Sequence, residues 1–289
     1  MLTAEALTNR AEVRRLLKEA GVRPSKRLGQ NFLVDAAAIE AIRAATSGID
    51  PQQIIEIGPG LGAVTHALAE LGVPVIGVEV DHRLAELLSV TTAALEGVEI
   101  IRADALAFDL GSDDLAWGRQ ASRRVVVGSI PYSITAPLLK HIVDHRQSLA
   151  GAVLVTQREV AEKVAASPGS EGSALGIMVQ AFCDVQVLRR IPRGAFLPVP
   201  DVDSTLWTLR FLEAPRFEAD EDLFFQVVRC LFGKRRKMIR GALRDLLDPE
   251  QVQAVLLDAG LDGSLRGEAL DFDSLDRLAM AYERNRASE

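Results

Sequence analysis

The chain has 289 residues, 48% of them hydrophobic, which exceeds the usual size of one domain, so we expect a large domain and a smaller one. Its apolar runs are short and broken by charges, which excludes a membrane-spanning helix, and the N-terminus lacks the long apolar segment of a secretory signal. The two cysteines, Cys183 and Cys230, match no metal-binding spacing, so we expect a reduced, metal-free protein of the cytoplasm.

The formal charge of −7 is distributed unevenly along the chain. Residues 245–289 hold 11 acids and 4 bases, so the residues before them are neutral overall. Within that neutral part, residues 229–244 carry seven basic side chains and no acid, and a second basic segment extends from Arg10 to Arg27. A solvated helix face would explain either segment alone, but two such segments favour a polyanionic partner.

In chain order, a charged amphipathic helix is predicted over residues 3–20, then a loop over 21–30 and a helix that begins near Asp35. Short β-type runs and helical patterns then alternate, with the runs at 54–57, 73–78, 98–101, 125–127 and 152–155. This alternation predicts an α/β fold with a mostly parallel, Rossmann-like sheet and helices on both of its faces. The runs at 185–188 and 205–211 alternate like strands at an antiparallel edge.

The composition becomes helical and strongly charged after Pro215, so we place a domain boundary near residue 213. Residues 1–213 are expected to form the catalytic domain, with a helical segment over 1–50. Residues 214–289 are expected to form a small helical domain, in which the basic residues between 234 and 244 lie on one helix.

A glycine-rich turn, Glu56-Ile-Gly-Pro-Gly-Leu-Gly62, follows the first strand of the alternating series. Glycines allow a tight turn and a close approach of a ligand to the backbone. Glu79 ends the second strand, where it can accept from two ribose hydroxyls, and Asp104 follows the third, where it can accept from an adenine amine. A dinucleotide fits the glycines almost as well, but Pro59 removes an amide that a pyrophosphate would use. Adenosylmethionine, which has no phosphate, fits the set better, and a structural turn with two solvated acids is the remaining alternative.

The segment Ser129-Ile-Pro-Tyr132 follows the apolar run 124–128. Because proline has no backbone N–H, carbonyls beside it are left free to accept, and Tyr132 offers a flat face for stacking. Chemistry on an extruded adenine or cytosine needs such groups. A proline-containing turn with Tyr132 packed on the core is the alternative.

These motifs occur in a fixed order along the chain, together with Lys26–Leu33, Gln157–Glu162, Phe196–Ser204 and Leu231–Leu243. With them the chain resembles, over about residues 20–280, the KsgA/RsmA family of ribosomal RNA adenine N6,N6-dimethyltransferases, to which the Erm methyltransferases are related. The resemblance implies a class I methyltransferase fold with S-adenosyl-L-methionine as cofactor. It also implies dimethylation of two adjacent adenines in the 3′-terminal hairpin of small-subunit ribosomal RNA, during biogenesis of that subunit. The expected partner is this RNA in a pre-30S particle, and we expect a monomer.

The resemblance also assigns the site residues. The cofactor residues are Gln30, Asn31, Leu33, Gly58, Gly60, Glu79, Val80, Asp104, Ala105 and Ser129. The catalytic residues are Ser129, Ile130, Pro131 and Tyr132, with Phe196 either a second stacking surface or part of the core. The RNA-binding residues are Lys234, Arg235, Arg236, Lys237, Arg240 and Arg244.

The chain departs from the family in two places. Ser129 stands where the family ordinarily has Asn, and residues 168–176 lack a Tyr-Gly pair expected in an RNA-facing loop. A serine hydroxyl keeps one acceptor but is shorter and can also donate, so we expect activity to be retained. An Erm-type enzyme acting on large-subunit RNA is one alternative, and a largely non-catalytic small-subunit assembly factor, which the change at Ser129 keeps open, is another.

Overall fold

A computed structural model of the chain describes residues 4–25, 27–112, 123–169, 172–234 and 236–287. The chain divides into two compact units. The first unit consists of Met1–Ala161 and Asp184–Phe211, and the second of Glu162–Cys183 and Leu212–Glu289. A boundary thus falls between residues 211 and 212, beside the expected one, whereas segment 162–183, expected in the first domain, groups with the second unit.

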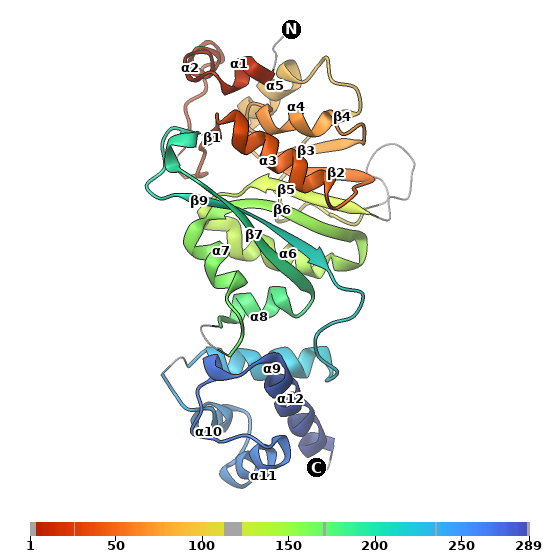
Figure 1. Cartoon of the computed structure of the whole chain (residues 1–289), viewed down its shortest axis with the longest axis vertical. Coiled ribbons are helices and arrows are strands. Elements are labelled where there is room, and N and C mark those ends of the chain that lie inside the picture. The colour runs from red at the N-terminus through yellow and green to blue at the C-terminus, as the bar shows by residue number, and fades with distance from the viewer. Residues whose placement is uncertain (1–3, 26, 113–122, 170–171, 235, 288–289) are drawn as a thin grey trace. The chain divides into compact units, whose positions relative to one another are not determined.

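The first unit is built on a seven-stranded sheet with the strand order β4-β3-β2-β5-β6-β9-β7 (Figure 1). The first five strands in this order, β4, β3, β2, β5 and β6, are parallel, and β9 pairs antiparallel with β6. The strands are β2 (Gln53–Ile57), β3 (Val75–Glu79), β4 (Val98–Arg102), β5 (Arg124–Ser129), β6 (Leu149–Gln157), β7 (Cys183–Ile191) and β9 (Ser204–Phe211). Branched apolar residues buried on both faces of a strand, such as Ile54 and Ile55, are typical of a parallel sheet. The predicted strands and fold class are therefore confirmed.

Helices cover both faces of this sheet, with α3 and α4 on one side and α6 on the other (Figure 1). The helices of the first unit are α1 (Ala4–Thr8), α2 (Arg10–Glu19), α3 (Ala36–Ser47), α4 (Ala63–Ala69), α5 (His82–Thr91) and α6 (Thr135–Asp144). The prediction of one helix over residues 3–20 is wrong. The helix is interrupted at Asn9, which has an extended backbone. Its side-chain oxygen caps α2 by accepting from the amides of Ala11 and Glu12.

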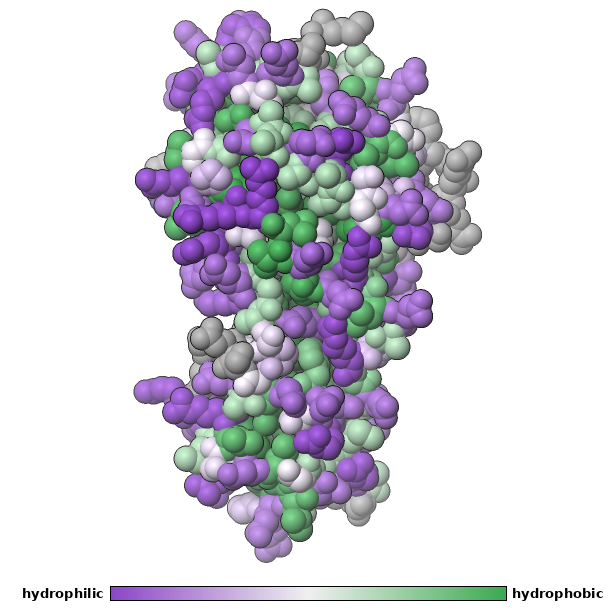
Figure 2. All heavy atoms as spheres, in the orientation of Figure 1, coloured by the Kyte–Doolittle hydropathy of each residue, from purple (hydrophilic) through white to green (hydrophobic). Residues whose placement is uncertain are grey.

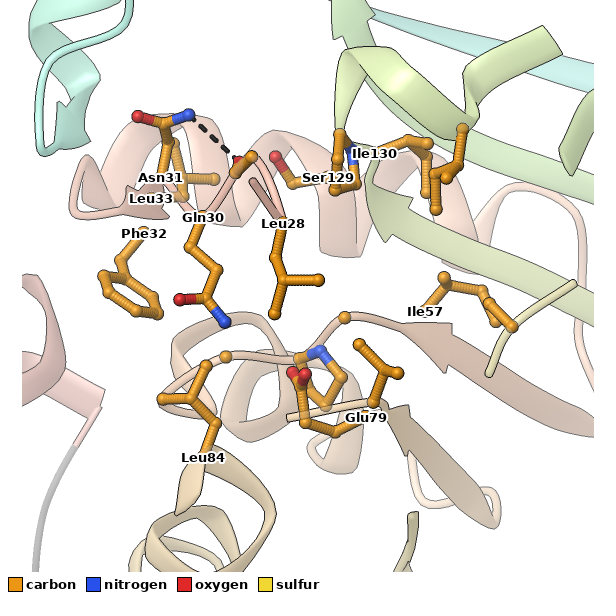
Figure 3. Close-up of a pocket in the computed structure, with 18 of the residues that line it drawn as sticks. Leu28, Gln30, Asn31, Phe32, Leu33, Ile57, Glu79, Leu84, Ser129 and Ile130 are labelled. Atoms are coloured by element: carbon orange, nitrogen blue, oxygen red, sulfur yellow. Dashed lines mark hydrogen bonds between the residues drawn. The ribbon is translucent and has the colours of Figure 1, made fainter. Parts of the chain in front are cut away.

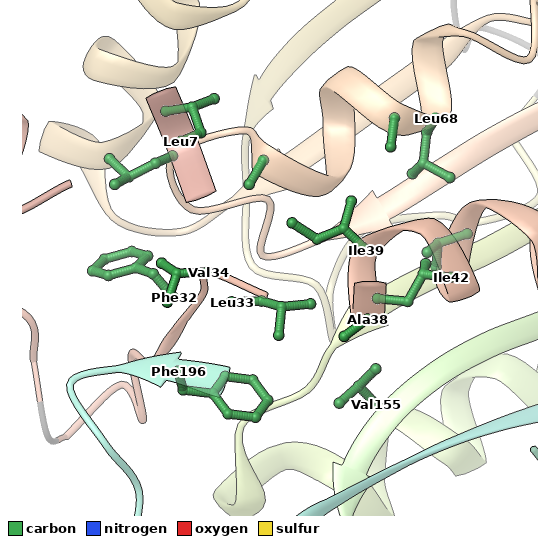
Figure 4. Packing of buried hydrophobic residues seen from close by; sticks show 14 of the residues in the cluster. Leu7, Phe32, Leu33, Val34, Ala38, Ile39, Ile42, Leu68, Val155 and Phe196 are labelled. Atoms are coloured by element: carbon green, nitrogen blue, oxygen red, sulfur yellow. The ribbon is translucent and has the colours of Figure 1, made fainter. Parts of the chain in front are cut away.

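A hydrophobic cluster joins the N-terminal segments to the sheet (Figure 4). Leu7 of α1, Phe32, Leu33, Ile39 and Val155 are all part of it. The short strand β1 (Phe32–Leu33) pairs antiparallel with β8 (Phe196–Leu197), so two segments far apart in the sequence share this core. The cluster therefore fixes the loop before Phe32 beside the carboxyl ends of the strands.

The second unit is helical and contains a cluster of phenylalanines. The rings of Phe217 and Phe224 stack at 4.2 Å, and Phe182 meets Phe217 edge-on at 5.7 Å. Because Phe182 comes from segment 162–183, this cluster explains why the segment groups with the C-terminal helices. The helices are α8 (Ala174–Gln180), α9 (Glu221–Phe232), α10 (Ile239–Ala242), α11 (Pro249–Ala259) and α12 (Phe272–Ala287), and α7 (Arg158–Ala165) spans the division between the units.

The prediction of one basic helix over residues 234–244 is wrong. Helix α9 ends at Phe232, the described residues from Gly233 to Arg236 form turns, Lys237 lies in a bend, and α10 has only four residues. The backbone of Met238 instead forms a bridge to Arg266, and the amide of Ile239 donates to the carbonyl of Leu265 at 2.8 Å. These long-range bonds override the local helix propensity of the basic residues.

Hydrophilic side chains cover much of the face seen in the space-filling view, and hydrophobic residues show in smaller patches (Figure 2). In the part of the chain that the structure describes, no helix combines the length and the apolar character that a membrane span requires.

Candidate functional site

A cavity of about 280 Å³ lies at the carboxyl ends of the parallel strands (Figure 3). Its lining includes every residue predicted to bind the cofactor or to act in catalysis. Most of these residues come from the loop before β1 and from the ends of four neighbouring strands, β2, β3, β4 and β5, while Leu33 lies in β1 and Phe196 in β8. The carboxyl ends of parallel strands meet at one edge of a sheet, where ligands of α/β proteins bind.

The glycine-rich turn needs its glycines for two reasons. Gly58, Gly60 and Gly62 have φ values of 66°, 61° and 90°, a region that side chains disfavour. A Cβ on Gly60 would also lie 3.0 Å from the ring of Phe32. The turn therefore presents bare backbone to the cavity.

Glu79 is a buried carboxylate held by backbone amides. Its Oε1 accepts from the amide of Asp81 at 2.9 Å, and the amide of Gly60 also interacts with it. Burial raises the pKa of Glu79, and the hydrogen bonds from Asp81 and Gly60 oppose that shift. The carboxylate is thus fixed at the end of β3, where it can accept from hydroxyl groups of a ligand.

Glu56 also lines the cavity, although the sequence analysis used it only as part of a motif. The Thr65 hydroxyl donates to its Oε2 at 2.6 Å. Burial, with a smaller contribution from the charge of Glu79, raises the pKa of Glu56 to about 7, although the hydrogen bond from Thr65 opposes the shift. Its position among the isoleucines of β2, before the glycines of the turn, was the sequence signal for a buried acid.

Gln30 closes the cavity from the loop before β1. Its Nε2 donates to Asp81 Oδ2 at 3.0 Å, and its Oε1 accepts from the amide of Ser25 at 2.7 Å. Asp81 also caps α5 by accepting from the amides of Arg83 and Leu84. The Gln30 amide therefore holds the loop to the start of α5, and Asp81 is a positioning residue that the sequence analysis missed.

The same loop approaches the Ser129–Tyr132 segment at Gly29. The Asn31 side chain donates to the Gly29 carbonyl at 3.1 Å (Figure 3). Gly29 has a φ of 62°, and a Cβ at this position would lie only 2.8 Å from Pro131 Cβ. Loop and segment are therefore packed directly against each other.

Within the Ser129–Tyr132 segment, the two candidate carbonyl acceptors differ. The Pro131 carbonyl accepts from the amide of Ile134 and from the Thr135 hydroxyl, both at 3.1 Å. Among the described residues, no donor binds the Ile130 carbonyl, while the Ile130 amide donates to Val155 at 2.9 Å. The Ile130 carbonyl is therefore the acceptor that remains for a ligand.

Tyr132 is 39% exposed and lies at the start of a 3₁₀ turn, Tyr132–Ile134. Its hydroxyl interacts with the side chains of Ser204 and Gln157. Burial raises the pKa of this hydroxyl and the charge of Asp201 raises it further, so the ring is neutral. The ring is held at its hydroxyl end and still exposes surface for stacking.

Phe196 lies elsewhere in the cavity wall, as a core residue. It is 2% exposed, and its carbonyl accepts from Arg10 at 3.0 Å. This burial favours packing in the core over a role as a second stacking surface.

Two of the side chains predicted to bind the cofactor are exposed. Asp104 accepts from the amide of Leu106 at 2.9 Å, and Val80 follows the end of β3.

The predicted RNA-binding residues belong to the second unit, whereas the residues that line the cavity belong to the first. Arg236, Lys237, Arg240 and Arg244 are exposed. Lys234 forms an ion pair with Asp245, and Arg235 lies outside the described residues.

Known proteins similar to this chain are ribosomal RNA methyltransferases. The ribosomal RNA adenine dimethylase family matches residues 22–274. The ribosomal RNA small subunit methyltransferase A of Pelotomaculum thermopropionicum is 39% identical, over 94% of this chain and 96% of that protein. The protein of the same name from Geobacillus thermodenitrificans is 36% identical, over 92% of this chain and 93% of that protein.

Solved structures agree with this relationship. The 23S rRNA methyltransferase ErmE superimposes with a TM-score of 0.69 at 26% identity, over 88% of this chain and all of that one (100%). A dimethyladenosine transferase from Plasmodium falciparum shares the fold, with a TM-score of 0.73 at 22% identity, over 88% of this chain and 98% of that one. The methyltransferase fold expected from the sequence is confirmed. The chain belongs to the ribosomal RNA adenine dimethylase family.

Proposed function

We propose that the protein transfers methyl groups from S-adenosylmethionine to N6 of two adjacent adenines in the 3′-terminal hairpin of small-subunit ribosomal RNA. The observation that carries this proposal is that Glu79, Asp104 and the Ser129–Tyr132 segment line one cavity, in a member of the dimethylase family. The side chains suited to bind a nucleoside cofactor and those suited to bind a target base therefore line the same cavity. The partner is the small ribosomal subunit or its precursor.

The residues present fit adenosylmethionine. The glycine turn leaves room for a ligand against bare backbone, Glu79 suits the ribose hydroxyls, and Asp104 suits the adenine amine. When bound, this cofactor supplies a methyl group already activated on a sulfonium.

The chain's own contribution is to orient the target amine. The lone pair of adenine N6 is delocalised into the ring, which makes the amine a poor nucleophile. The Ser129 hydroxyl and the free Ile130 carbonyl can accept from its two N–H bonds, which favours a pyramidal nitrogen with its lone pair directed at the methyl group. The Tyr132 ring holds the base by stacking. Alignment then supplies most of the catalysis, and the methylated amine can lose its proton to water without a strong base.

Docking of the RNA is assigned to the second unit. Its exposed basic residues between 236 and 244 suit contacts to phosphates, which position an RNA without reading its sequence. Lys234 contributes less, because Asp245 already pairs with it.

Methyl incorporation into unmodified small-subunit particles, compared with large-subunit RNA, tests the proposal. We expect incorporation into small-subunit RNA alone, and loss of most of it in Tyr132→Ala. Incorporation into large-subunit RNA would instead indicate an Erm-type enzyme, and tight binding of the particle without incorporation would indicate an assembly factor.

A further inference from the structure

A second cavity, of about 370 Å³, is lined by Gln157, whose side chain interacts with the Tyr132 hydroxyl. The Tyr132 hydroxyl links the two cavities, because it interacts with Gln157, which lines the second cavity, and with Ser204, which lines the first. The second cavity is lined mainly by polar and charged side chains from three segments of the first unit: Gln157, Arg158, Glu159, Arg193, Asp201 and Asp203.

Asp203 joins these three segments. Its Oδ1 accepts from the amide of Arg193 at 2.8 Å, and its carbonyl accepts from the amide of Arg158 at 3.2 Å. Its Oδ2 accepts from the guanidinium of Arg190, at 3.0 Å from Nε. The Arg190 guanidinium and the Arg193 amide hold the pKa of Asp203 below its usual range. The charge of Asp203 is therefore matched within the protein, and Asp203 sets the position of the backbone at Arg193.

Arg193 differs from the other arginines of this region. Arg190 is paired with Asp203, and Arg10 donates to the carbonyls of Gly194 and Phe196. The side chain of Arg193 is exposed and lines the cavity, and no described residue accepts a hydrogen bond from its guanidinium or forms an ion pair with it. A guanidinium on a fixed backbone, without a partner among the described residues, is suited to bind a phosphate group.

We propose that this second cavity binds the nucleotide that adjoins the target adenine, with the Arg193 guanidinium on the phosphate that links the two. The inference rests on the proposed function and adds a subsite to it. A base stacked on Tyr132 has its linking phosphates close by, and Gln157, which interacts with the Tyr132 hydroxyl, lines the second cavity next to that base. Phosphate contacts fix the register of a nucleic acid. A subsite for the neighbouring nucleotide therefore sets which of two adjacent adenines stands at Tyr132.

The proposal concerns one contact and not a general attraction for RNA. The cavity lining holds Arg158 and Arg193 against three acids, Glu159, Asp201 and Asp203, so its formal charge is −1 and the cavity as a whole does not attract RNA. Removing the charge of a single phosphate should therefore abolish the contribution of Arg193, whereas neutral linkages elsewhere in the RNA should leave it unchanged.

The test measures equilibrium binding of hairpin RNAs that carry one uncharged methylphosphonate linkage. The linkage is placed directly 5′ of the target adenine, directly 3′ of it, or in the distant stem. Arg193→Ala is compared with Arg43→Ala, which removes the same charge from the surface of α3, where Arg43 pairs with Glu40. We expect a neutral linkage on one side of the target to weaken binding by wild type and Arg43→Ala by roughly five- to tenfold. Arg193→Ala should bind fully charged RNA more weakly by the same factor and should not respond to that linkage.

Two results would overturn the proposal. One is an equal loss for wild type and Arg193→Ala at each neutral linkage, and the other is an Arg193→Ala variant that binds charged RNA as tightly as Arg43→Ala does. Because binding needs no turnover, the result does not depend on catalysis. Absence of methyl transfer by wild type to unmodified small-subunit particles would contradict the proposed function separately.

Discussion

Glu56 and Glu79 are two buried carboxylates on neighbouring strands, and their surroundings give them different roles. Glu79 faces backbone amides of the glycine turn and of the start of α5, which stabilise its charge. Glu56 meets the Thr65 hydroxyl, and its pKa is raised to about 7 by burial. One acid is therefore suited to accept from a ligand, and the other to hold a proton within the fold.

Glu79→Ala should weaken adenosylmethionine binding by roughly 1–3 kcal/mol, because it removes a charge-assisted acceptor for the ribose hydroxyls. Titration calorimetry measures this directly. An unchanged affinity would show that Glu79 only stabilises the turn.

Glu56 should make stability depend on pH. Because its pKa is raised in the folded state, the folded protein holds the proton more tightly than the unfolded chain does. The contribution of Glu56 to the free energy of unfolding is therefore fully present below the ordinary value of 4.5 and is lost as the pH rises to about 7. The loss amounts to as much as about 3 kcal/mol.

Urea unfolding of wild type and Glu56→Gln, at about pH 5 and about pH 8, checks this expectation. Glutamine cannot ionise, so the stability of wild type relative to the variant should fall with rising pH. A difference that is the same at both values would mean that Glu56 does not titrate in this range.

At the scale of elements, the cavity depends on a loop packed against a strand end. The loop containing Gln30 is joined to the start of α5 through Asp81, to β8 through the pairing of β1, and to Pro131 through the close approach at Gly29. The residues of this loop that we expect to bind the cofactor are thus placed by contacts with three distant segments.

Gly29→Ala tests this arrangement, with Gly21→Ala as a matched control. Both glycines have positive φ, 62° and 64°, so each substitution should cost about 1 kcal/mol of backbone strain. Only at Gly29 would the new methyl meet Pro131; at Gly21 it would meet no atom within 4 Å. We expect both variants to unfold at lower temperature, and only Gly29→Ala to bind adenosylmethionine more weakly. Equal cofactor affinities would show that the contact with Pro131 does not hold the site together.

The strand-end residues were predictable because they depend on local patterns. Apolar runs located the strands, and parallel strands bring the residues after them, such as Glu79 and Asp104, to one edge. The contact between Gln30 and Asp81 was not predictable, since it joins residues 51 positions apart through loop packing. The prediction of a helix over the basic segment 234–244 was wrong for a related reason. The charges are evident in the sequence, but the backbone conformation is set by hydrogen bonds to residues 263–266.

At the scale of the whole molecule, the chain passes between the two units three times, after residues 161, 183 and 211. The cavities belong to the first unit, and the basic residues assigned to docking belong to the second. Binding of cofactor and docking of RNA should therefore respond to different substitutions.

Replacing Arg235, Arg236 and Lys237 by Ala should flatten the dependence of RNA binding on salt concentration. Three lost phosphate contacts correspond to a change in slope of up to about 2 for single-stranded RNA. Adenosylmethionine affinity should stay the same, because these residues lie in the second unit. An unaltered salt dependence would show that this segment does not contact the RNA.

The central claim is that methyl transfer takes place at the Ser129–Tyr132 segment, and mass spectrometry of the modified RNA tests it most directly. After reaction with small-subunit particles, wild type should leave N6,N6-dimethyladenosine at two adjacent positions of the 3′-terminal hairpin. Ser129→Ala should be slower by only several-fold, since one neutral hydrogen bond of about 1 kcal/mol is lost. Tyr132→Ala should be far slower, because it removes the stacking that holds the base. Equal rates for all three proteins, or modification at other positions, would contradict the account.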